Sequence, residues 1–417
     1  MSDRALLREL FDRAVAVADP MRFIGPNLPE RPQGRLLVVG AGKASARMAE
    51  AVEAEWGPCD GLVITRYGYG RPTRGIEIVE AAHPVPDQAG VDATARMLDL
   101  LGGLRADDLV VMLISGGASA LLCAPAGEMT LAEKQAVNAA LLASGAPIGQ
   151  MNLLRKHLSR VKGGQLAAAA APARVVALMI SDVPGDDPAM IGSGPTVGDG
   201  STDKEAREIV SRWQIALPES AQAVLNAGSG VIPPGDARLA RVENRVVAAP
   251  AQSLDAAAEL LAARGIESVI LGDDLNGEAR EVAQDHARLA LEKQAALSGD
   301  EVLVILSGGE LTVTRRGDGV GGPNAEYALA LAVALNGAEG ILAIACDTDG
   351  VDGAAEVAGA IITPDTLARA RDAGLDPARA LDRNDAHSFF GALGDQVVPG
   401  PTLTNVNDFR AILIRPA

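Results

Sequence analysis

Several short segments of the chain combine glycines with lysine, serine or aspartate, the residue types that bind and transfer phosphate groups. Gly40-Ala41-Gly42-Lys43 follows an apolar run and precedes an Ala-rich stretch that predicts a helix. Glycines allow a tight turn and a helix N-terminus favours an anion, so Lys43 could reach a phosphate group there. The turn is not a Walker A loop, because leucine replaces the first glycine, and Ser45 replaces the third glycine of GxGxxG. An ordinary strand-to-helix turn with a lysine in solvent fits equally well.

A second glycine turn, Ser115-Gly116-Gly117, ends another apolar run, and Ser119 follows it. Its backbone N–H groups could form an anion-binding nest. Both serines could instead serve only as helix caps. The GxSxG pattern of a nucleophile elbow does not surround either serine, so we do not expect a serine nucleophile.

Aspartates follow two other apolar runs. Asp182 stands at a predicted strand end, where it could bind Mg²⁺ or contact a substrate hydroxyl group, whereas Asp186 and Asp187 suit turn chemistry. Residues 346–353, which include Asp349, resemble half of an EF-hand loop, but no glutamate closes it. We therefore expect Mg²⁺ or substrate hydroxyl groups there, with an Asp-rich turn as the alternative.

Residues 151–164 form the only dense basic stretch in an acidic chain. The formal net charge is −17 and only six residues are lysine. Arg155 and its neighbours could hold a carboxylate or phosphate group, or could form a solvated helix face. An acidic surface repels nucleic acid and anionic lipid, so we expect neither nucleic acid nor a membrane as a partner.

Apolar runs that end in glycine alternate with Ala-rich helical stretches along both halves of the chain. Continuous Val/Ile/Leu runs are typical of parallel strands buried on both faces. We predict an α/β protein of two domains. Residues 1–238 form a Rossmann-like, mostly parallel sheet with helices on both faces, and residues 239–417 form a smaller α/β domain with a mixed sheet. Residues 311–322 predict a hairpin. Ligands on such sheets bind at the carboxyl ends of strands, where the turns described above fall.

Composition supports a large globular protein. The chain has 417 residues, of which 48% are hydrophobic and 22% charged, enough for two or three domains. Three widely spaced cysteines, Cys59, Cys123 and Cys346, provide neither a disulfide framework nor a zinc site. The charged, amphipathic N-terminal segment does not resemble a signal peptide, and no apolar run is long enough to span a membrane. We therefore expect a cytoplasmic protein.

Nine motifs, in order across nearly the whole chain, resemble those of the glycerate 2-kinase family, whose C-terminal part is the MOFRL domain. They are GAGKASARMAEA, HPVPD, ISGGASALL, LRKHLSRVKGGQLA, SDVPGDDPAMIGSGPT, LSGGELTV, GGPNAEYALALA, DTDGVDG and TNVNDF. The resemblance implies that ATP, with Mg²⁺, phosphorylates the 2-hydroxyl group of D-glycerate to give 2-phosphoglycerate. It also implies an active site in the cleft between two α/β domains. We expect a monomer or a homodimer.

The resemblance carries over to particular residues. Lys43 matches the family's lysine and would hold the reacting phosphate group, and Asp182 would bind Mg²⁺ or accept the proton of the substrate hydroxyl group. Glu310 would contact the metal or the nucleotide. The remaining candidates are Gly40, Gly42, Ser115, Gly116, Gly117, Ser307, Gly308, Gly309, Asn324 and Glu326 for the nucleotide, and Ser119, Arg155 and Asp349 for the substrate.

The sequence departs from the family pattern at Pro323, where an arginine usually stands, and at Leu403, often a glycine. An arginine stabilises the charge of a transferring phosphoryl group. Other arginines could substitute, namely Arg155, Arg160, Arg315 and Arg316.

Two other functions remain open. One is an NAD(P)H-dependent hydroxypyruvate reductase, the name that many relatives carry. An NAD site needs an acidic residue about 20 positions after the first turn. Here the nearest, Asp60, precedes its strand instead of ending it. The other is an inactive relative that binds a sugar acid, which the departure at Pro323 suggests.

Overall fold

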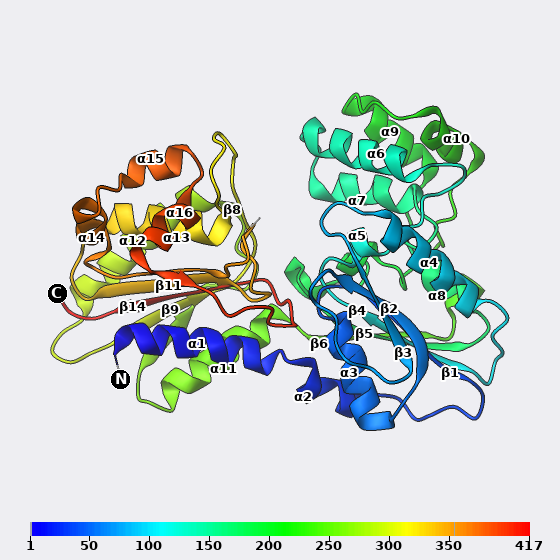
Figure 1. Ribbon diagram of the computed structural model, residues 1–417, viewed down its shortest axis with the longest axis horizontal. Coiled ribbons are helices and arrows are strands. Elements are labelled where there is room, and N and C mark those ends of the chain that lie inside the picture. The colour runs from blue at the N-terminus through cyan, green and yellow to red at the C-terminus, as the bar shows by residue number, and fades with distance from the viewer. Residues whose placement is uncertain (1, 354) are drawn as a thin grey trace. The chain divides into compact units, whose positions relative to one another are not determined.

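The computed structural model describes residues 2–353 and 355–417. The chain divides into two compact units. The first unit comprises Pro20–Asp182 and Asp186–Val247, and the second comprises Met1–Asp19, Val183–Gly185 and Ala248–Ala417. Each unit has its own sheet and its own covering helices (Figure 1).

The first unit is built on a six-stranded sheet with the order β3-β2-β1-β4-β5-β6. Its first five strands run parallel, and Val39 of β1 pairs with Leu62 of β2 and Met112 of β4. This is the doubly wound order, in which the path of the chain reverses between β1 and β4 and ligands bind at their carboxyl ends. The strands are β1 (Leu36–Ala41), β2 (Asp60–Arg66), β3 (Ile76–Ala81), β4 (Leu109–Ile114), β5 (Arg174–Ile180) and β6 (Val242–Ala248).

Helices cover both faces of this sheet. Every residue of β4 is buried, and successive side chains of a strand point to opposite faces, so neither face of β4 reaches water. The apolar runs therefore predicted buried parallel strands correctly. The helices near the sheet are α2 (Pro20–Asn27), α3 (Ser45–Trp56), α4 (Gln88–Leu101), α5 (Ala118–Leu121) and α8 (Gln165–Ala169).

Four further helices of the first unit pack on one another around a small core of their own (Figure 1). Leu141, Leu154 and Ile209 are among its buried residues. Thr130 and Glu133 form a capping box at the start of α6, which fixes where this helix begins. This helical layer was not predicted from the sequence. Its helices are α6 (Leu131–Ser144), α7 (Ile148–His157), α9 (Asp203–Arg212) and α10 (Glu219–Ala227).

The second unit contains a mixed six-stranded sheet with the order β13-β12-β11-β14-β9-β7, as predicted. Only the β7–β9 pair is parallel, and β14 runs antiparallel to both of its neighbours, β11 and β9. The strands are β7 (Glu267–Ile270), β9 (Leu303–Ser307), β11 (Ile341–Asp347), β12 (Gly359–Ile362), β13 (Gln396–Val397) and β14 (Asp408–Ile414).

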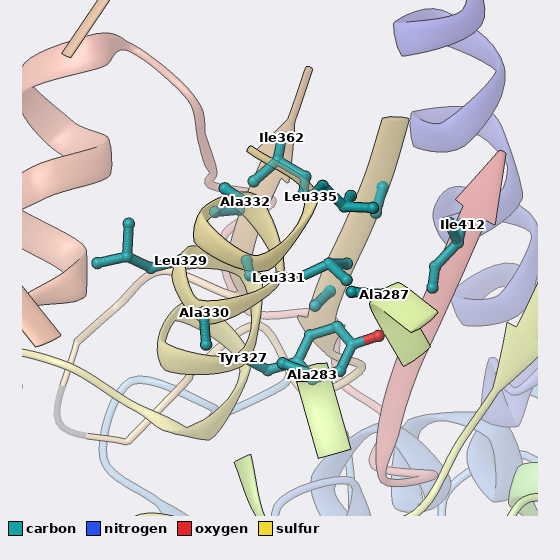
Figure 2. Close-up of a cluster of buried hydrophobic side chains, with 14 of the residues drawn as sticks. Ala283, Ala287, Tyr327, Leu329, Ala330, Leu331, Ala332, Leu335, Ile362 and Ile412 are labelled. Atoms are coloured by element: carbon teal, nitrogen blue, oxygen red, sulfur yellow. The ribbon is translucent and has the colours of Figure 1, made fainter. Parts of the chain in front are cut away.

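Alternate residues of these strands enter two separate cores. Ile412 packs with Tyr327, Leu331 and Leu335 in the core beneath α12 and α13 (Figure 2). Leu413, one residue on, faces the core beneath α1 and α11. The helices are α1 (Asp3–Val17), α11 (Pro250–Ala262), α12 (Ala279–Ala296), α13 (Pro323–Leu335), α14 (Thr366–Asp372), α15 (Pro377–Asp382) and α16 (Ala386–Leu393).

The structural division differs from the predicted boundary after residue 238 at three places, of which the short segment Val183–Gly185 in the second unit is the smallest. The strand β6 continues the first sheet before the chain enters α11. The helix α1 belongs to the second unit, where Ser253 Oγ donates a hydrogen bond to the Ala14 carbonyl oxygen at 2.9 Å. Leu10 and Phe11 are fully buried there, so the apolar stripe of α1 decides its position.

The predicted hairpin at 311–322 is wrong. Only the two-residue strand β10 (Leu311–Thr312) forms in this segment, and it pairs in parallel with β8 (Gly277–Glu278). The side chain of Asn384 accepts hydrogen bonds from the N–H groups of Arg316 and Gly317, which holds the segment open. In the part of the chain that the structure describes, no helix is both long enough and apolar enough to cross a bilayer.

Candidate active site

The turns that follow β1 and β4 bind to each other. The Lys43 N–H group donates to the Gly116 carbonyl oxygen at 2.8 Å, and the Ala44 N–H group donates to Ser115 Oγ at 3.1 Å. Ser45 Oγ lies 3.1 Å from Ser115 Oγ. The two glycine turns singled out in the sequence therefore form one structure at the point where the sheet reverses its winding.

Glycine is required in the first turn because the two turns approach so closely. A Cβ atom on Gly42 would lie 2.0 Å from Ser115 Oγ, and one on Gly40 would lie 2.2 Å from the Leu113 carbonyl oxygen. Gly42 also has a φ of +141°, which side-chain-bearing residues rarely adopt. These glycines thus place Lys43 directly beside the β4 turn.

Lys43 and His83 flank Gly117. A Cβ atom on Gly117 would lie 3.0 Å from His83 Cδ2 and 3.3 Å from Lys43 Cγ. His83 follows β3 in a proline-rich loop, to which the sequence by itself gave little weight. The structure brings three strand ends together at this glycine.

A pocket of about 200 Å³ opens beside Gly117. Three of its lining residues are cationic, and none is an aspartate or glutamate among the residues that the structure describes. A cationic pocket in so acidic a chain indicates an anionic ligand. The lining residues are His83, Pro84, Gly117, Ser119, Ala120, Lys134, Asn138, Arg155 and Lys162.

The cations of this pocket are buried and only partly neutralised. Burial lowers the pKa of Lys134 to about 8 and that of Lys162 to about 7, and it also lowers the pKa of Arg155. Lys162 Nζ donates to the carbonyl oxygens of Ser119 at 2.7 Å and Leu122 at 3.2 Å. Lys134 Nζ is buried without a hydrogen-bond partner among the described residues. The pocket therefore has unused donor capacity.

The basic residues of the stretch 151–164 make contacts in two different places. Arg155 and Lys162 face the pocket, whereas Lys156 forms an ion pair with Asp199 at 2.6 Å. His157 is buried and lies 2.9 Å from Asp203 through Nδ1, in contact with a different loop. The sequence predicted that this stretch could bind an anion, but it did not show which of the basic side chains line the same pocket.

His157 also lies 3.0 Å from Ser201 Oγ through Nε2, an arrangement that resembles a Ser-His-Asp triad. Ser201 Oγ already donates to Asp199, so its proton does not point to the imidazole. A nucleophilic serine needs the histidine to accept that proton. The cluster therefore holds the loop against α7.

Two substrate residues suggested by the sequence, Ser119 and Arg155, line the pocket. Lys134, Asn138 and His83 also line it, and the sequence analysis did not assign a role to the first two. Lys134 and Asn138 are four residues apart, so they lie on the same face of α6. The scarcity of lysine in the chain was the only available signal for Lys134.

Asp182 is half-buried and lies two residues beyond the end of β5, as predicted from the apolar run. Asp187 accepts a hydrogen bond from the Ala189 N–H group at 2.9 Å, which fits turn chemistry. Asp186 has a positive φ of 53° within the same turn. Asp182 is therefore the aspartate of this segment placed at a strand end.

In the second unit, a buried arginine holds the turn Ser307-Gly308-Gly309. Arg410 donates to the carbonyl oxygens of Gly308 and Gly309 and forms an ion pair with Asp408 at 3.0 Å. Burial raises the pKa of Asp408 to about 6, although Arg410 and Asn324 act in the opposite direction. Arg410, which fixes the shape of this turn, was not among the residues predicted from the sequence.

The amide group of Asn324 donates to Asp408 Oδ1 at 2.6 Å and so connects α13 to β14. Asp352 accepts from the N–H groups of Asn324 and Ala325 at 3.0 and 2.8 Å, and His387 lies 3.0 Å from its carboxylate. Pro323 occupies the start of α13, where the absent N–H group costs no hydrogen bond.

Two predicted contact residues are occupied within the second unit. Glu326 is buried, pairs with Arg280 at 2.6 Å and accepts from Asn384 at 3.0 Å, so its carboxylate connects α12 and α13. Asp349 is fully buried and accepts from the Val351 N–H group at 2.8 Å. Both contacts are structural ones that sequence spacing could not show. Glu310 is exposed beside its turn.

The chain matches known proteins over its whole length. Residues 6–226 match the family model described as a domain of unknown function, DUF4147, and residues 303–408 match the MOFRL family. The chain is 36% identical to D-glycerate 2-kinase of Thermotoga maritima, with 97% of each chain covered. It is 54% identical to a protein of Agrobacterium vitis provisionally named hydroxypyruvate reductase, with 99% of this chain and 95% of that protein covered.

Solved structures show the same similarity. The crystal structure of glycerate kinase from Thermotoga maritima matches with a TM-score of 0.86 at 35% identity, and 99% of each chain is covered. A protein of Pyrococcus horikoshii matches with a TM-score of 0.79 at 32% identity, covering 100% of this chain and 99% of that one. The resemblance predicted from the nine motifs is confirmed, and the chain belongs to the glycerate kinase family, with a DUF4147 domain followed by a MOFRL region.

Proposed function

We propose that the protein is a glycerate 2-kinase, which transfers the γ-phosphoryl group of ATP to the 2-hydroxyl group of D-glycerate and releases 2-phosphoglycerate. The observation that carries this proposal is the meeting of Lys43 and the cationic pocket at Gly117. A phosphate-directed lysine beside a pocket for a small anion is what a kinase of a hydroxy acid needs.

The chemistry requires charge neutralisation more than a strong base, because the transition state of phosphoryl transfer is loose. The hydroxyl oxygen of glycerate forms a bond to the γ-phosphorus while the bond to the oxygen that bridges to the β-phosphate breaks. Lys43 stabilises the negative charge on the transferring group. Asp182, at the end of β5, accepts the hydroxyl proton.

The residues present fit ATP and Mg²⁺ in chemical type. Glycine turns suit phosphate groups, and the candidates are the turns at Gly40–Gly42 and Ser115–Gly117. The N–H groups of Gly42 and Ser115 already donate to the carbonyl oxygens of Ile64 and Ala41, so these two groups are not the proposed phosphate donors. Bound Mg²⁺ would neutralise phosphate charge, with Asp182 and Glu310 as candidate ligands. No cluster of three or more His, Cys, Asp or Glu side chains suited to a metal occurs among residues 2–353 and 355–417. Phosphotransferase sites commonly hold Mg²⁺ through only one or two carboxylates and the phosphates.

The remaining proposed nucleotide contacts are residues of the second unit. Ser307, Gly308 and Gly309 form a turn whose shape Arg410 fixes, and Asn324 lies in the same hydrogen-bonded network. Glu326 is not proposed as a contact, since its carboxylate is occupied. That both units contribute to one active site stays a prediction.

The reductase is the alternative, because relatives carry that name. In dinucleotide-binding sheets an acidic side chain at the end of the second strand binds the adenosine ribose of NAD. Here β2 ends with Thr65 and Arg66, and Thr65 Oγ1 donates to the Gly42 carbonyl oxygen at 3.1 Å. The position therefore lacks the ribose-binding carboxylate. Oxidation of NADH or NADPH by hydroxypyruvate, followed by absorbance, tests this alternative directly.

The decisive experiment supplies D-glycerate, ATP and Mg²⁺ to the purified protein and couples the product to enolase without a mutase. Because enolase accepts 2-phosphoglycerate, a direct signal identifies the 2-hydroxyl group as the acceptor. We expect Lys43→Ala to lower kcat by about 10²–10³-fold with an unchanged melting temperature, since the lost charge acts on the transition state. Lys204→Ala is the matched control, because this lysine side chain is 80% exposed. Near-normal turnover in Lys43→Ala would remove this lysine from the mechanism.

A further inference from the structure

The burial of Lys134 in the first unit is not explained by the contacts that this residue makes within the protein. Its side chain lies on α6 and lines the cationic pocket, although the residue is only 5% exposed. Its ammonium group has no hydrogen-bond partner among the described residues. A buried, unpaired ammonium group is costly and persists only where something compensates for it.

The other buried lysines of the first unit are satisfied by the protein. Lys156 has an ion pair with Asp199 at 2.6 Å, and Lys162 donates to two carbonyl oxygens. Lys134 has neither kind of partner among the described residues. The groups beside it are the cations Arg155 and Lys162 and the thiol of Cys123, and burial raises the pKa of that thiol, so these neighbours supply no anion. The missing partner is therefore an anion that comes from outside the chain.

Asn138 adds a second requirement on the ligand. It lies one helical turn beyond Lys134 and lines the same pocket, and its Oδ1 atom is buried without a hydrogen-bond partner in the described structure. A side-chain amide offers both a carbonyl acceptor and an N–H donor. A ligand that satisfies both residues carries an anionic group and a hydroxyl group.

The size of the pocket limits the ligand further. Its volume of about 200 Å³ is below the roughly 300–1,000 Å³ of pockets for drug-sized molecules. A hydroxy acid of three or four carbons fits this volume. Arg155 could pair with the same carboxylate in a bidentate manner.

We infer that Lys134 and Asn138 form the acid-binding subsite of the pocket, in which Lys134 is the counter-ion of a small 2-hydroxy carboxylate and Asn138 bonds its hydroxyl group. The identity of the acid as D-glycerate rests on the proposed function, but the chemical class rests on the pocket. Neither residue was among the candidates that the sequence analysis had named.

The experiment is calorimetric titration with D-glycerate, in the absence and in the presence of a non-hydrolysable ATP analogue. The proteins are the wild type, Lys134→Met, Asn138→Leu and the exposed control Lys204→Met. We expect Lys134→Met to weaken binding at least tenfold and the control to bind as the wild type does. We expect Asn138→Leu to lose most of the preference for D-glycerate over propionate, which has a carboxylate but no hydroxyl group.

Melting temperatures separate a binding role from a structural one. Methionine matches the shape of the lysine stem and removes a buried charge, so Lys134→Met without ligand should melt at the same temperature as the wild type or higher. A lower melting temperature together with weaker binding would mean that Lys134 supports the fold, and would overturn the inference. Unchanged affinity in Lys134→Met would overturn it as well.

The outcomes also separate this inference from the proposed function. If the wild type binds D-glycerate through Lys134 but does not phosphorylate it, the subsite stands and the kinase assignment fails. If it phosphorylates D-glycerate and Lys134→Met leaves KM unchanged, the kinase stands and the subsite fails. Absence of binding to D-glycerate, D-lactate and tartronate by the wild type would also overturn the subsite.

Discussion

Gly42→Ala tests whether the close contact between the β1 and β4 turns positions Lys43. The added Cβ atom would lie 2.0 Å from Ser115 Oγ and 2.6 Å from the Ser115 carbonyl oxygen, whereas ordinary contacts begin near 3.4 Å. One of the turns must therefore move by about 1.4 Å (3.4 − 2.0 Å). Ser115 Oγ cannot simply rotate away, because it accepts from the Ala44 N–H group and lies 3.1 Å from Ser45 Oγ.

The displacement falls on Lys43, the residue next to Gly42. A misplacement of about 1 Å in a reacting group can lower the rate by roughly 10²-fold. Overpacking of a buried contact costs about 1–3 kcal/mol of stability. We therefore expect Gly42→Ala to lower kcat by about two orders of magnitude and to lower the melting temperature. KM for D-glycerate should change little, because Gly42 does not line the cationic pocket.

The assay is the enolase-coupled kinase reaction, with thermal unfolding of the same preparations. Gly68→Ala is the matched control, since Gly68 also has a positive φ, +80°, but no atom lies within 4 Å of its added Cβ. Any loss specific to Gly42→Ala then comes from the steric contact and from its φ of +141°, which lies farther from the left-handed region than that of Gly68. In Gly42→Ala/Ser115→Ala we expect only partial recovery, because the carbonyl oxygen of residue 115 remains. Wild-type kcat in Gly42→Ala would refute the reasoning.

Two further substitutions test other parts of the structure. Burial would raise the pKa of Asp199, but hydrogen bonds from Lys156 and Ser201 lower it to about 2, so this carboxylate stabilises the fold above pH 4 and loses that contribution as the pH falls towards 2. Asp199→Asn should therefore lower the free energy of unfolding at pH 7, measured with urea, and should reduce its decline between pH 4 and 2. A variant with the same pH dependence as the wild type would count against the ion pair. Pro323→Arg should raise kcat about tenfold or more, because an arginine can stabilise the transferring phosphoryl group. The melting temperature should change little, because the first position of α13 tolerates either residue. An equal or lower kcat would show that no such role is vacant.

The fully buried strands could be predicted from the sequence because their burial leaves a direct trace, whereas β3, which is only partly buried, was not predicted. A strand covered on both faces needs apolar side chains at every position, and β4 shows this in Leu109–Ile114. The turns after β1 and β4 could be predicted as well, since their close contact requires glycine at Gly40 and Gly42. The motifs at these turns also gave the family, which the comparisons confirm.

Contacts between distant segments left no such trace. The amphipathic pattern of α1 shows that it must bury one face, but not that this face packs beside Phe409 of the second unit. The hairpin expected at 311–322 failed for the same reason, because Asn384 holds that segment. The local pattern of Thr and Val was compatible with a hairpin, and a remote side chain decided otherwise.

The chemistry of the candidate site divides in the same way. The sequence by itself determined which residue types stand at strand ends, because the chain must turn there and the turns carry Lys43, Ser119 and Asp182. Only the tertiary structure decided which charges remain unpaired. Glu326 was predicted to contact the nucleotide and is bound by Arg280, whereas Lys134 was not singled out in the sequence and is buried with no hydrogen-bond partner among the described residues. The physical reason is that desolvation and pairing depend on neighbours brought together by folding, which spacing along the chain does not record.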